Sequence, residues 1–174
     1  MKQKKDHLML VNNIAVQGPV CCTDWSKTPI TFLKQDLQLE SYPHTNTMVI
    51  KANIAGWEIN RVLIDSGSSI DIIFVNAFDQ MKLSRSQLQP LDSPLIGFRG
   101  KRIDALGKIS LPVSFGGQES ARTEYVTFDI VDLYYPYNAI FGRGFANKFN
   151  AAIHMGYLCM KMIALYVTIT VHDS

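Results

Sequence analysis

The chain has 174 residues, of which 47% are hydrophobic, and a formal net charge of +2 at neutral pH. This length and composition suit one compact domain with a sizeable core. Apart from three lysines near the start, the basic residues are scattered along the chain, which argues against a nucleic-acid-binding protein.

Cysteine and histidine usage argues against two further kinds of site. The cysteines are Cys21, Cys22 and Cys159, an odd number whose first two members are neighbours, so no disulfide framework is expected. The four histidines lie far apart without ligand spacing. We therefore predict that the protein binds neither a metal nor any other cofactor. We also predict that it resides in a reducing compartment.

The apolar stretches are short. "LMLV" is interrupted by Asn12 and Asn13 before it reaches signal-peptide length, and "MIALYVTITV" falls short of the roughly 20 apolar residues that span a bilayer. We predict a soluble, intracellular, cytoplasmic protein without membrane contact.

The predicted elements are mainly strands. Residues 1–45 show little sustained periodicity and are expected to be a lead-in or linker segment. From Met48 to Ile54 apolar residues alternate with polar ones, a turn follows at 55–57, and "RVLI" runs back as a second strand. This hairpin delivers Asp65 to a turn.

The rest of the chain continues the β pattern. "IDIIF" is predicted as a strand, and "VNAFDQMKL" as a helical turn. Alternation over 108–115 and 123–131 predicts a second hairpin, with Pro112 on an edge strand or facing solvent. "PYNAIFGRG" is expected to be extended, "FANKF" a short helix and "YLCMKM" the final strand.

Asp65 is the leading candidate for chemistry. In "VLIDSGSSIDIIF" it stands between two apolar runs, at the edge of the predicted core. Asp and Ser-Gly pairs are also common turn formers, so the triplet alone favours an ordinary turn. A carboxylate at a core edge is nevertheless costly to ionise without partners, and such groups are functional candidates.

Two glycine-marked stretches accompany it. In "PLIGFRGKR", Gly97 and Gly100 bracket Phe98 and Arg99, a spacing that permits a tight hairpin tip able to cover a ligand. In "NAIFGRG", apolar residues precede Gly142, which can pack a loop against the Asp-Ser-Gly turn. Together the three stretches are more specific than any one of them.

These stretches resemble the retroviral-type aspartic proteases, and most closely the protease segment of plant Ty3/gypsy retrotransposon polyproteins. The resemblance rests on "VLIDSGSSIDIIF", "LIGFRG", "GKISLPVSFGG" and "PYNAIFGRG", with "TPITF" and "YPHTNTMVIKANIAGWEINRVLID" upstream. It covers about residues 27–162. It implies a mainly β, retropepsin-like closed barrel with a flap hairpin and one or two short helices.

The resemblance also implies roles for individual residues. Asp65 would be the catalytic aspartate, with Ser66 and Gly67 completing the triplet. The flap and substrate-binding residues would be Gly97, Phe98, Arg99, Gly100 and Ser69. Structural support of the site would come from Ile140, Phe141, Gly142 and Arg143.

Two features depart from the family pattern. Ser66 stands where Thr is commoner, keeping the hydroxyl that can brace the loop but losing the methyl group. After "YLCMKM" the usual Phe-Pro-Thr is replaced by "MIALYVTITVHDS". We therefore expect a protease domain at 46–162, followed by an off-pattern tail at 163–174.

The chemistry implied by the resemblance needs two carboxylates, one to activate water and one to polarise the scissile carbonyl. No second Asp-Ser-Gly or Asp-Thr-Gly occurs, and the remaining acids are predicted to be exposed or in turns: Asp71, Asp92, Asp104, Asp129 and Asp132. We therefore predict a homodimer that pairs two copies of Asp65 and cleaves a peptide or polyprotein substrate. The "YLCMKM" strand is expected to contribute to the dimer sheet.

Alternatives remain open. The chain can be a catalytically inactive copy that keeps the fold as a dimerisation or peptide-binding module. It can also be the retropepsin-like domain of a host protein, although this would not explain the upstream matches. Phe98 can be ordinary core and Arg143 a surface charge. Nucleotide binding at "GFRG" or "FGRG" is excluded, because neither follows a strand and opens a long helix.

Overall fold

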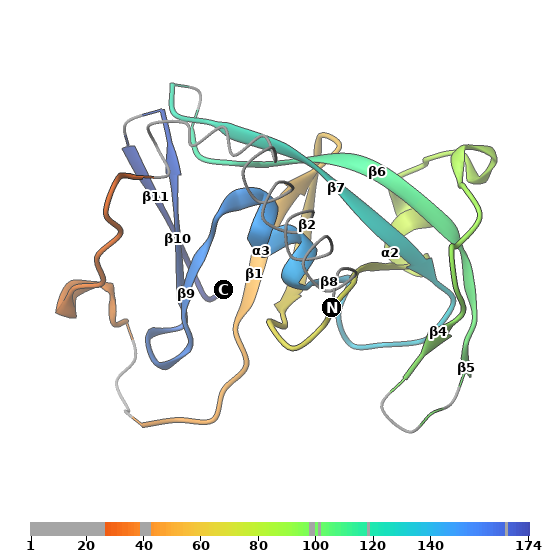
Figure 1. Cartoon of the computed structure of the whole chain (residues 1–174), viewed down its shortest axis with the longest axis horizontal. Helices are drawn as coiled ribbons and strands as arrows, with labels where there is room; N and C mark the ends of the chain where they lie inside the picture. Colours follow the sequence, from red (N-terminus) through yellow and green to blue (C-terminus); the bar gives the residue numbers. More distant parts are fainter. Residues whose placement is uncertain (1–26, 39–42, 98–99, 101, 118, 166) are drawn as a thin grey trace, which may run out of the picture.

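The computed structural model describes residues 27–38, 43–97, 100, 102–117, 119–165 and 167–174 (Figure 1). The strands are β1 (Val49–Ile54), β2 (Trp57–Ile64), β3 (Asp71–Phe74), β4 (Leu95–Ile96), β5 (Arg102–Ile103), β6 (Ala105–Phe115), β7 (Arg122–Val131), β8 (Ala139–Phe141), β9 (Ala152–His154), β10 (Cys159–Ala164) and β11 (Val167–His172). The helices are α2 (Val75–Gln80) and α3 (Arg143–Phe149), with 3-10 turns η2 (Lys34–Asp36), η3 (Arg85–Gln87) and η4 (Met155–Tyr157). The fold is mainly β, as predicted.

Six strands close into a barrel in the order β1-β2-β8-β3-β7-β6. The predicted first hairpin is confirmed: β1 pairs antiparallel with β2, and the turn between them holds Ala55 and Gly56 at positive φ. Alternate residues of β1 are buried because successive side chains of a strand point to opposite faces. The alternation of apolar and polar residues in β1 therefore reflects a barrel strand with one face towards the core.

The second predicted hairpin is also confirmed, and it closes the barrel. β6 and β7 pair antiparallel from Ala105 to Phe115, while Val113 and Ser114 of β6 pair with β1 on the other side. β6 is not an edge strand of the closed barrel, so the first predicted position for Pro112 is wrong, whereas its half-buried side chain fits the second, a position turned towards solvent. Pairing with β1 ends at Val113, so no partner needs the missing N–H of Pro112, and its carbonyl accepts a hydrogen bond from Ala55 N (2.8 Å).

Helix α3 packs its aromatic side chains into the barrel core. Phe145 and Phe149 are fully buried, and the Phe145 ring stacks on Phe141 of β8 with centroids 4.2 Å apart. Phe115 of β6 meets both helix rings edge-on, at 5.8 and 5.4 Å. This burial fixes the short helix against β8, because a helix of two turns has little stability of its own.

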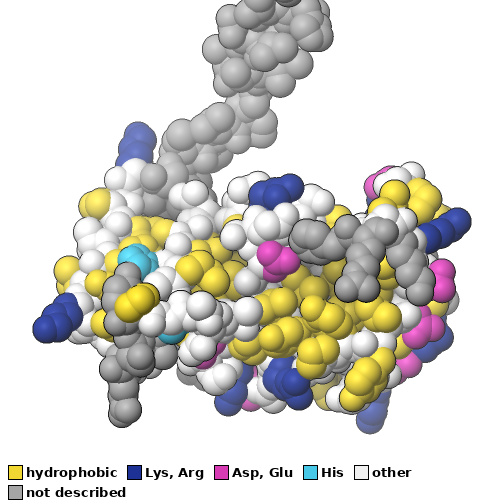
Figure 2. Space-filling view, turned by 90° about the horizontal axis from the view of Figure 1, so that it is seen from below, with side chains coloured by type: hydrophobic (Ala, Val, Ile, Leu, Met, Phe, Trp, Pro, Cys, Tyr) yellow, Lys and Arg dark blue, Asp and Glu magenta, His cyan; other side chains and the backbone are white. Residues whose placement is uncertain are grey.

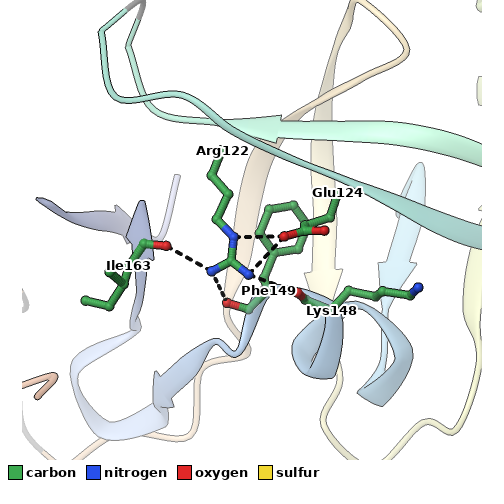
Figure 3. A network of polar contacts seen from close by, with 5 residues as sticks. All are labelled: Arg122, Glu124, Lys148, Phe149 and Ile163. Atoms are coloured by element: carbon green, nitrogen blue, oxygen red, sulfur yellow. Dashed lines mark hydrogen bonds and ion pairs between the residues drawn. The ribbon is translucent and has the colours of Figure 1, made fainter. Parts of the chain in front are cut away.

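A buried arginine joins α3 to the strands around it (Figure 3). Arg122 of β7 is 8% exposed, and its guanidinium donates to the carbonyl oxygens of Phe149 (2.6 Å), Lys148 (3.0 Å) and Ile163 (2.9 Å). It also donates to the Glu124 carboxylate at 3.0 and 3.1 Å. Two of the carbonyls lie at the end of α3, where they have no partner within the helix.

Beside the barrel, at the left of Figure 1, lies a second sheet of order β11-β10-β9. β10 is buried throughout and covers the last four residues of the predicted "YLCMKM" strand, whose Tyr157 belongs to η4, and it is not the last strand. β11 pairs with it over its whole length, and Ser174 N donates to Val49 O (2.9 Å) at the start of β1. Residues expected to form an off-pattern tail are therefore part of the folded structure, and β10 has a neighbour on each side.

The described part of the N-terminal segment packs on this second sheet. Asp36, 6% exposed, forms an ion pair with Lys161 of β10 (2.8 Å) and accepts from Leu33 N (2.6 Å). The Leu33 hydrogen bond, together with Lys161, lowers the pKa of Asp36. Lys161 also donates to Thr31 O (3.0 Å). Residues 27–38 are thus tied to a strand more than a hundred positions away.

Two sequence predictions concern cysteines and membranes. Cys159 is buried with a free thiol, whereas Cys21 and Cys22 lie outside the described residues. Within the described ranges, no helix has the length and apolarity needed to cross a membrane.

Candidate active site

Asp65 follows the last residue of β2 and opens a tight turn. Its main-chain oxygen accepts from Ser68 N (3.0 Å), and its carboxylate Oδ1 accepts from Gly67 N (3.0 Å). A Cβ on Gly67 would lie 3.2 Å from that oxygen, closer than side chains ordinarily approach. Glycine therefore lets the backbone approach the carboxylate, which is itself half-buried.

β8 holds together the two strands on either side of this turn. It runs parallel to β2, pairing Leu63 with Ile140, and antiparallel to β3, pairing Ile72 with Ile140. Asp65 N donates to Phe141 O (2.9 Å), so the pairing continues to the catalytic candidate itself. Ile140 is half-buried and Phe141 is buried in the core.

Gly142 and Arg143 clamp the turn from the end of β8. A Cβ on Gly142 would collide with the carbonyl oxygen of Ile70 and lie 2.8 Å from that of Ser68. Arg143 N donates to Ser68 O (3.0 Å), and the Arg143 guanidinium donates to Gly67 O (2.9 Å). The Asp-Ser-Gly turn thus meets the "NAIFGRG" stretch, and Arg143, although exposed, is hydrogen-bonded to the turn.

The serines of the turn differ in their surroundings. Ser66 and Ser69 are exposed, whereas Ser68 is half-buried. Ser68 Oγ donates to Ile70 O (2.8 Å) and accepts from Ile70 N (3.3 Å). Within the described part of the chain, the hydroxyl that braces the turn belongs to Ser68, which sequence reasoning passed over, and not to Ser66.

The predicted flap stem forms the hairpin of β4 and β5. Gly100 N donates to Gly97 O (2.9 Å), and Gly100 has a φ of +68°. Phe98 and Arg99, which would form the tip, lie outside the described residues. The stem places Leu95 and Ile103 in a small apolar cluster that also holds Ile72, Phe74, Val131, Ile70 and Ile140.

This cluster reaches from the flap stem to the residues beside Asp65. Figure 1 shows the β2–β3 turn, the β7–β8 connection and the β4–β5 hairpin along one edge of the molecule. Seen from that edge, hydrophobic side chains gather on the half that holds the hairpin (Figure 2). Exposed apolar residues of the connection and stem include Tyr134 (89% exposed) and Ile96 (70%).

Asp71 is the functional candidate that sequence reasoning missed. The prediction of an exposed or turn-forming residue is wrong, because Asp71 begins β3 with only 5% of its surface exposed. Its Oδ1 accepts from Gly142 N (2.7 Å) and Phe145 N (3.2 Å). Burial raises the pKa of Asp71, the two N–H groups act in the opposite direction, and Asp129 adds to the increase.

Within the described residues, the other carboxylates form no hydrogen bond with the turn. Asp92 pairs with Lys108 (2.5 Å), Asp104 and Asp132 are exposed, and Asp129 is half-buried in β7 with its pKa raised by desolvation. A pocket of about 290 Å³ lies next to the turn, lined partly by Ser69, Asp92 and Asp129. Across the described ranges, no group of three His, Cys, Asp or Glu side chains has an arrangement suited to a metal ion.

Comparison with known proteins identifies the fold. No protein-family model matches the chain, and no curated protein matches it in sequence. The retroviral protease-like domain of Ddi1 from Leishmania major superposes with a TM-score of 0.57 at 14% identity, over 75% of this chain and 96% of that domain.

Two other solved structures are similar. A retropepsin-like aspartic protease from Rickettsia conorii gives a TM-score of 0.50 at 14% identity, over 71% of this chain and 85% of that one. EIAV protease, complexed with the inhibitor HBY-793, gives 0.48 at 17% identity, over 66% of this chain and 98% of that one. With its closed six-stranded barrel and two short helices, the chain has the fold of the retropepsin-like aspartic proteases.

Proposed function

We propose that the chain is an aspartic endopeptidase of retroviral type, which cleaves peptide bonds through a water activated by two Asp65 residues of a homodimer. The observation that carries this proposal is the bracing of the Asp65 turn. β8 pairs with the strands on both sides of it, and Gly142 and Arg143 contact its main chain. Such support fixes the carboxylate at the end of a rigid scaffold.

The reaction needs one ionised and one protonated carboxyl group, as in other aspartic proteases. The ionised group takes a proton from water, whose oxygen attacks the scissile carbonyl carbon, while the protonated group donates to the carbonyl oxygen. Proton transfer to the amide nitrogen then releases the amine as the C–N bond breaks. Two carboxyl groups that close cannot both ionise cheaply, so they share one proton.

A two-fold axis beside the turn brings the second carboxylate. The sequence contains a single Asp-Ser-Gly triplet, so one copy supplies half of the site and a symmetric dimer completes it. β10 is already flanked by β9 and β11, so any strand pairing between copies falls to an outer strand of the second sheet, not to β10 as expected from the sequence.

The substrate is an extended peptide lying between the Asp65 turn and the β4–β5 hairpin. Gly97, Phe98, Arg99 and Gly100 form the flap that covers it, and Ser69 contacts its main chain beyond the catalytic turn. The apolar cluster that runs from Leu95 to Ile70 and Ile140 gives this groove a hydrophobic wall. Peptides with apolar residues next to the scissile bond are therefore the substrates of choice.

The chain originates as the protease segment of a plant Ty3/gypsy-type polyprotein and acts in the cytoplasm on that polyprotein. This part of the proposal rests on the upstream stretches "TPITF" and "YPH" in addition to the site motifs. Reading frames for a reverse transcriptase beside the coding sequence support this origin, and their absence contradicts it.

The test is turnover of a polyprotein-derived peptide at mildly acid pH by the native chain, Asp65→Asn and Asp79→Asn. Asp79 is an exposed aspartate that pairs with Arg85 on the surface, so its replacement controls for loss of an acidic group. We expect cleavage by the native chain and Asp79→Asn, and none by Asp65→Asn. Equal turnover in all three overturns the proposal. Peptide binding without cleavage by native chain and Asp65→Asn alike favours an inactive binding module.

A further inference from the structure

We propose that Asp71 is a positioning residue, which holds the Asp65 turn in place through the start of α3; its effect on catalysis rests on the proposed function. Asp71 lies six positions after Asp65, and its carboxylate accepts hydrogen bonds from Gly142 N and Phe145 N. Its influence passes through the residues that clamp the turn.

The carboxylate supplies the cap that the start of α3 lacks. The residue preceding the helix is Gly142, which has no side chain to accept a hydrogen bond from the first-turn N–H groups. Asp71 Oδ1 reaches across from β3 and accepts from Gly142 N (2.7 Å) and Phe145 N (3.2 Å). Two N–H groups in a buried region thereby gain a partner from a different element.

The same two residues at the start of α3 touch the Asp65 turn. Gly142 packs against the carbonyl oxygens of Ser68 and Ile70, and Arg143 donates to Ser68 O and Gly67 O. Asp71 therefore acts on the catalytic turn through one intervening residue, Gly142. A shift of Gly142 moves the groups that fix Gly67, whose N–H contacts the Asp65 carboxylate.

The close approach of Asp71 explains why the "NAIFGRG" motif has a second glycine, Gly144. A Cβ at position 144 would collide with Asp71 Oδ2, so only glycine lets the carboxylate approach the helix start this closely. Asp71 and Gly144 thus form a matched pair, one supplying the acceptor and the other the space. Neither residue has a role in the chemistry of the Asp65 pair.

The bonding pattern depends on an acceptor oxygen and not on a full charge. Both described N–H donors point to Oδ1, so an Asn side chain with its amide oxygen at that position keeps both hydrogen bonds. Ala removes the acceptor and leaves two buried N–H groups without it. This difference separates a specific hydrogen-bonding role from a general need for an acidic residue.

The experiment compares Asp71→Asn, Asp71→Ala and Gly144→Ala with Asp129→Asn as the matched control. Asp129 is the neighbouring half-buried aspartate, it makes no hydrogen bond to α3 within the described residues, and it is no part of the catalytic turn. For each full-length variant, kcat and KM on the peptide and the hydrogen-exchange rates of the Gly142 and Arg143 N–H groups are measured. Exchange in β7 reports whether the barrel remains folded.

We expect Asp71→Asn and Asp129→Asn to retain kcat, and Asp71→Ala and Gly144→Ala to lose about 100-fold in kcat with a smaller change in KM, because the carboxylate is misplaced. In the latter two, Gly142 and Arg143 exchange faster while β7 stays protected. A folded Asp71→Ala chain with native kcat and native exchange rates overturns the inference. An Asp71→Asn chain that loses as much kcat as Asp71→Ala also overturns it. If Asp71→Ala does not fold, the kcat and the Gly142 and Arg143 exchange rates of Gly144→Ala and Asp71→Asn test the inference instead. Native values in a folded Gly144→Ala then overturn it.

Failure of this inference is distinguishable from failure of the proposed function. If the native chain cleaves no peptide, the endopeptidase proposal fails, and the exchange rates of Gly142 and Arg143 alone judge whether Asp71 holds the helix start. If the native chain is active and the Asp71→Ala chain is equally active, the positioning role fails while the endopeptidase proposal stands.

Discussion

Asp71 and Arg122 hold opposite ends of helix α3. The carboxylate accepts from two N–H groups at its start, and the guanidinium donates to the carbonyl oxygens of Lys148 and Phe149 at its end (Figure 3). Each charge has the sign that the helix dipole favours at that terminus. Both side chains are more than nine-tenths buried, so these contacts are shielded from water.

This arrangement links two parts of the molecule that are far apart in the sequence. At the start of α3 lies the Asp65 turn, and beyond its end lies β10, whose Ile163 carbonyl is also bound by Arg122. The helix is short and has its own aromatic side chains in the core. It therefore serves as a rigid connection between the candidate site and the second sheet.

Replacing Arg122 by Met is expected to lower the free energy of unfolding by about 3 kcal/mol or more, because three buried carbonyl groups lose their donor. Chemical denaturation measures this change. Arg85→Met serves as control, since Arg85 pairs with Asp79 on the surface and such a pair contributes less than about 1 kcal/mol. Similar losses in both variants would contradict the role of the Arg122 network.

Gly142→Ala is expected to destabilise the fold by about 1–3 kcal/mol through overpacking and to reduce peptide turnover. The added Cβ meets the Ile70 and Ser68 carbonyl oxygens, which belong to a hydrogen-bonded turn and cannot move freely. Thermal unfolding and kinetics of the same preparation test both effects. Gly117→Ala is the control, because a Cβ there has no atom within 4 Å. A Gly142→Ala chain as stable and active as this control would refute the close packing.

Asp36 is expected to make stability depend on pH. Its hydrogen bond from Leu33 N and its ion pair with Lys161 lower the pKa of Asp36 in the folded chain. The resulting stabilisation is present above the ordinary pKa of aspartate and is lost as the pH falls through the lowered pKa.

Asp36→Asn should therefore be less stable than the native chain at neutral pH, and the difference should disappear in strong acid. Urea denaturation across this range, with Asp79→Asn as an exposed control, measures the difference. A gap between native chain and Asp36→Asn that stays constant down to strong acid would show that ionisation of Asp36 does not stabilise the fold.

Much of the barrel follows from local sequence patterns. The alternation of β1 and the hairpin of β6 and β7 are predicted correctly, because side-chain burial in a strand repeats every two residues. The packing of Gly142 against the Asp65 turn is expected from the glycine-marked sequence, whereas the support from Arg143 is expected only from the resemblance. These contacts span about 75 positions, as between Gly67 and Arg143, and no local pattern encodes them.

The predictions that fail depend on such distant partners. Asp71 reads as a turn former because its two N–H partners lie 71 and 74 positions further on. Pro112 reads as an edge residue because the sequence does not show where pairing with β1 ends. Roles of Phe98 and Arg99 in the flap stay predictions, since both lie outside the described residues.

The central claim is that two copies of the chain share one active site. The most direct measurement is peptide turnover by a fixed amount of native chain while Asp65→Asn chain is added in excess and the subunits exchange. We expect turnover to fall on the order of tenfold at tenfold excess, because most native subunits then pair with a partner that lacks the carboxylate. Turnover that is unchanged by the excess, from a chain that sediments as a monomer, would contradict the shared site.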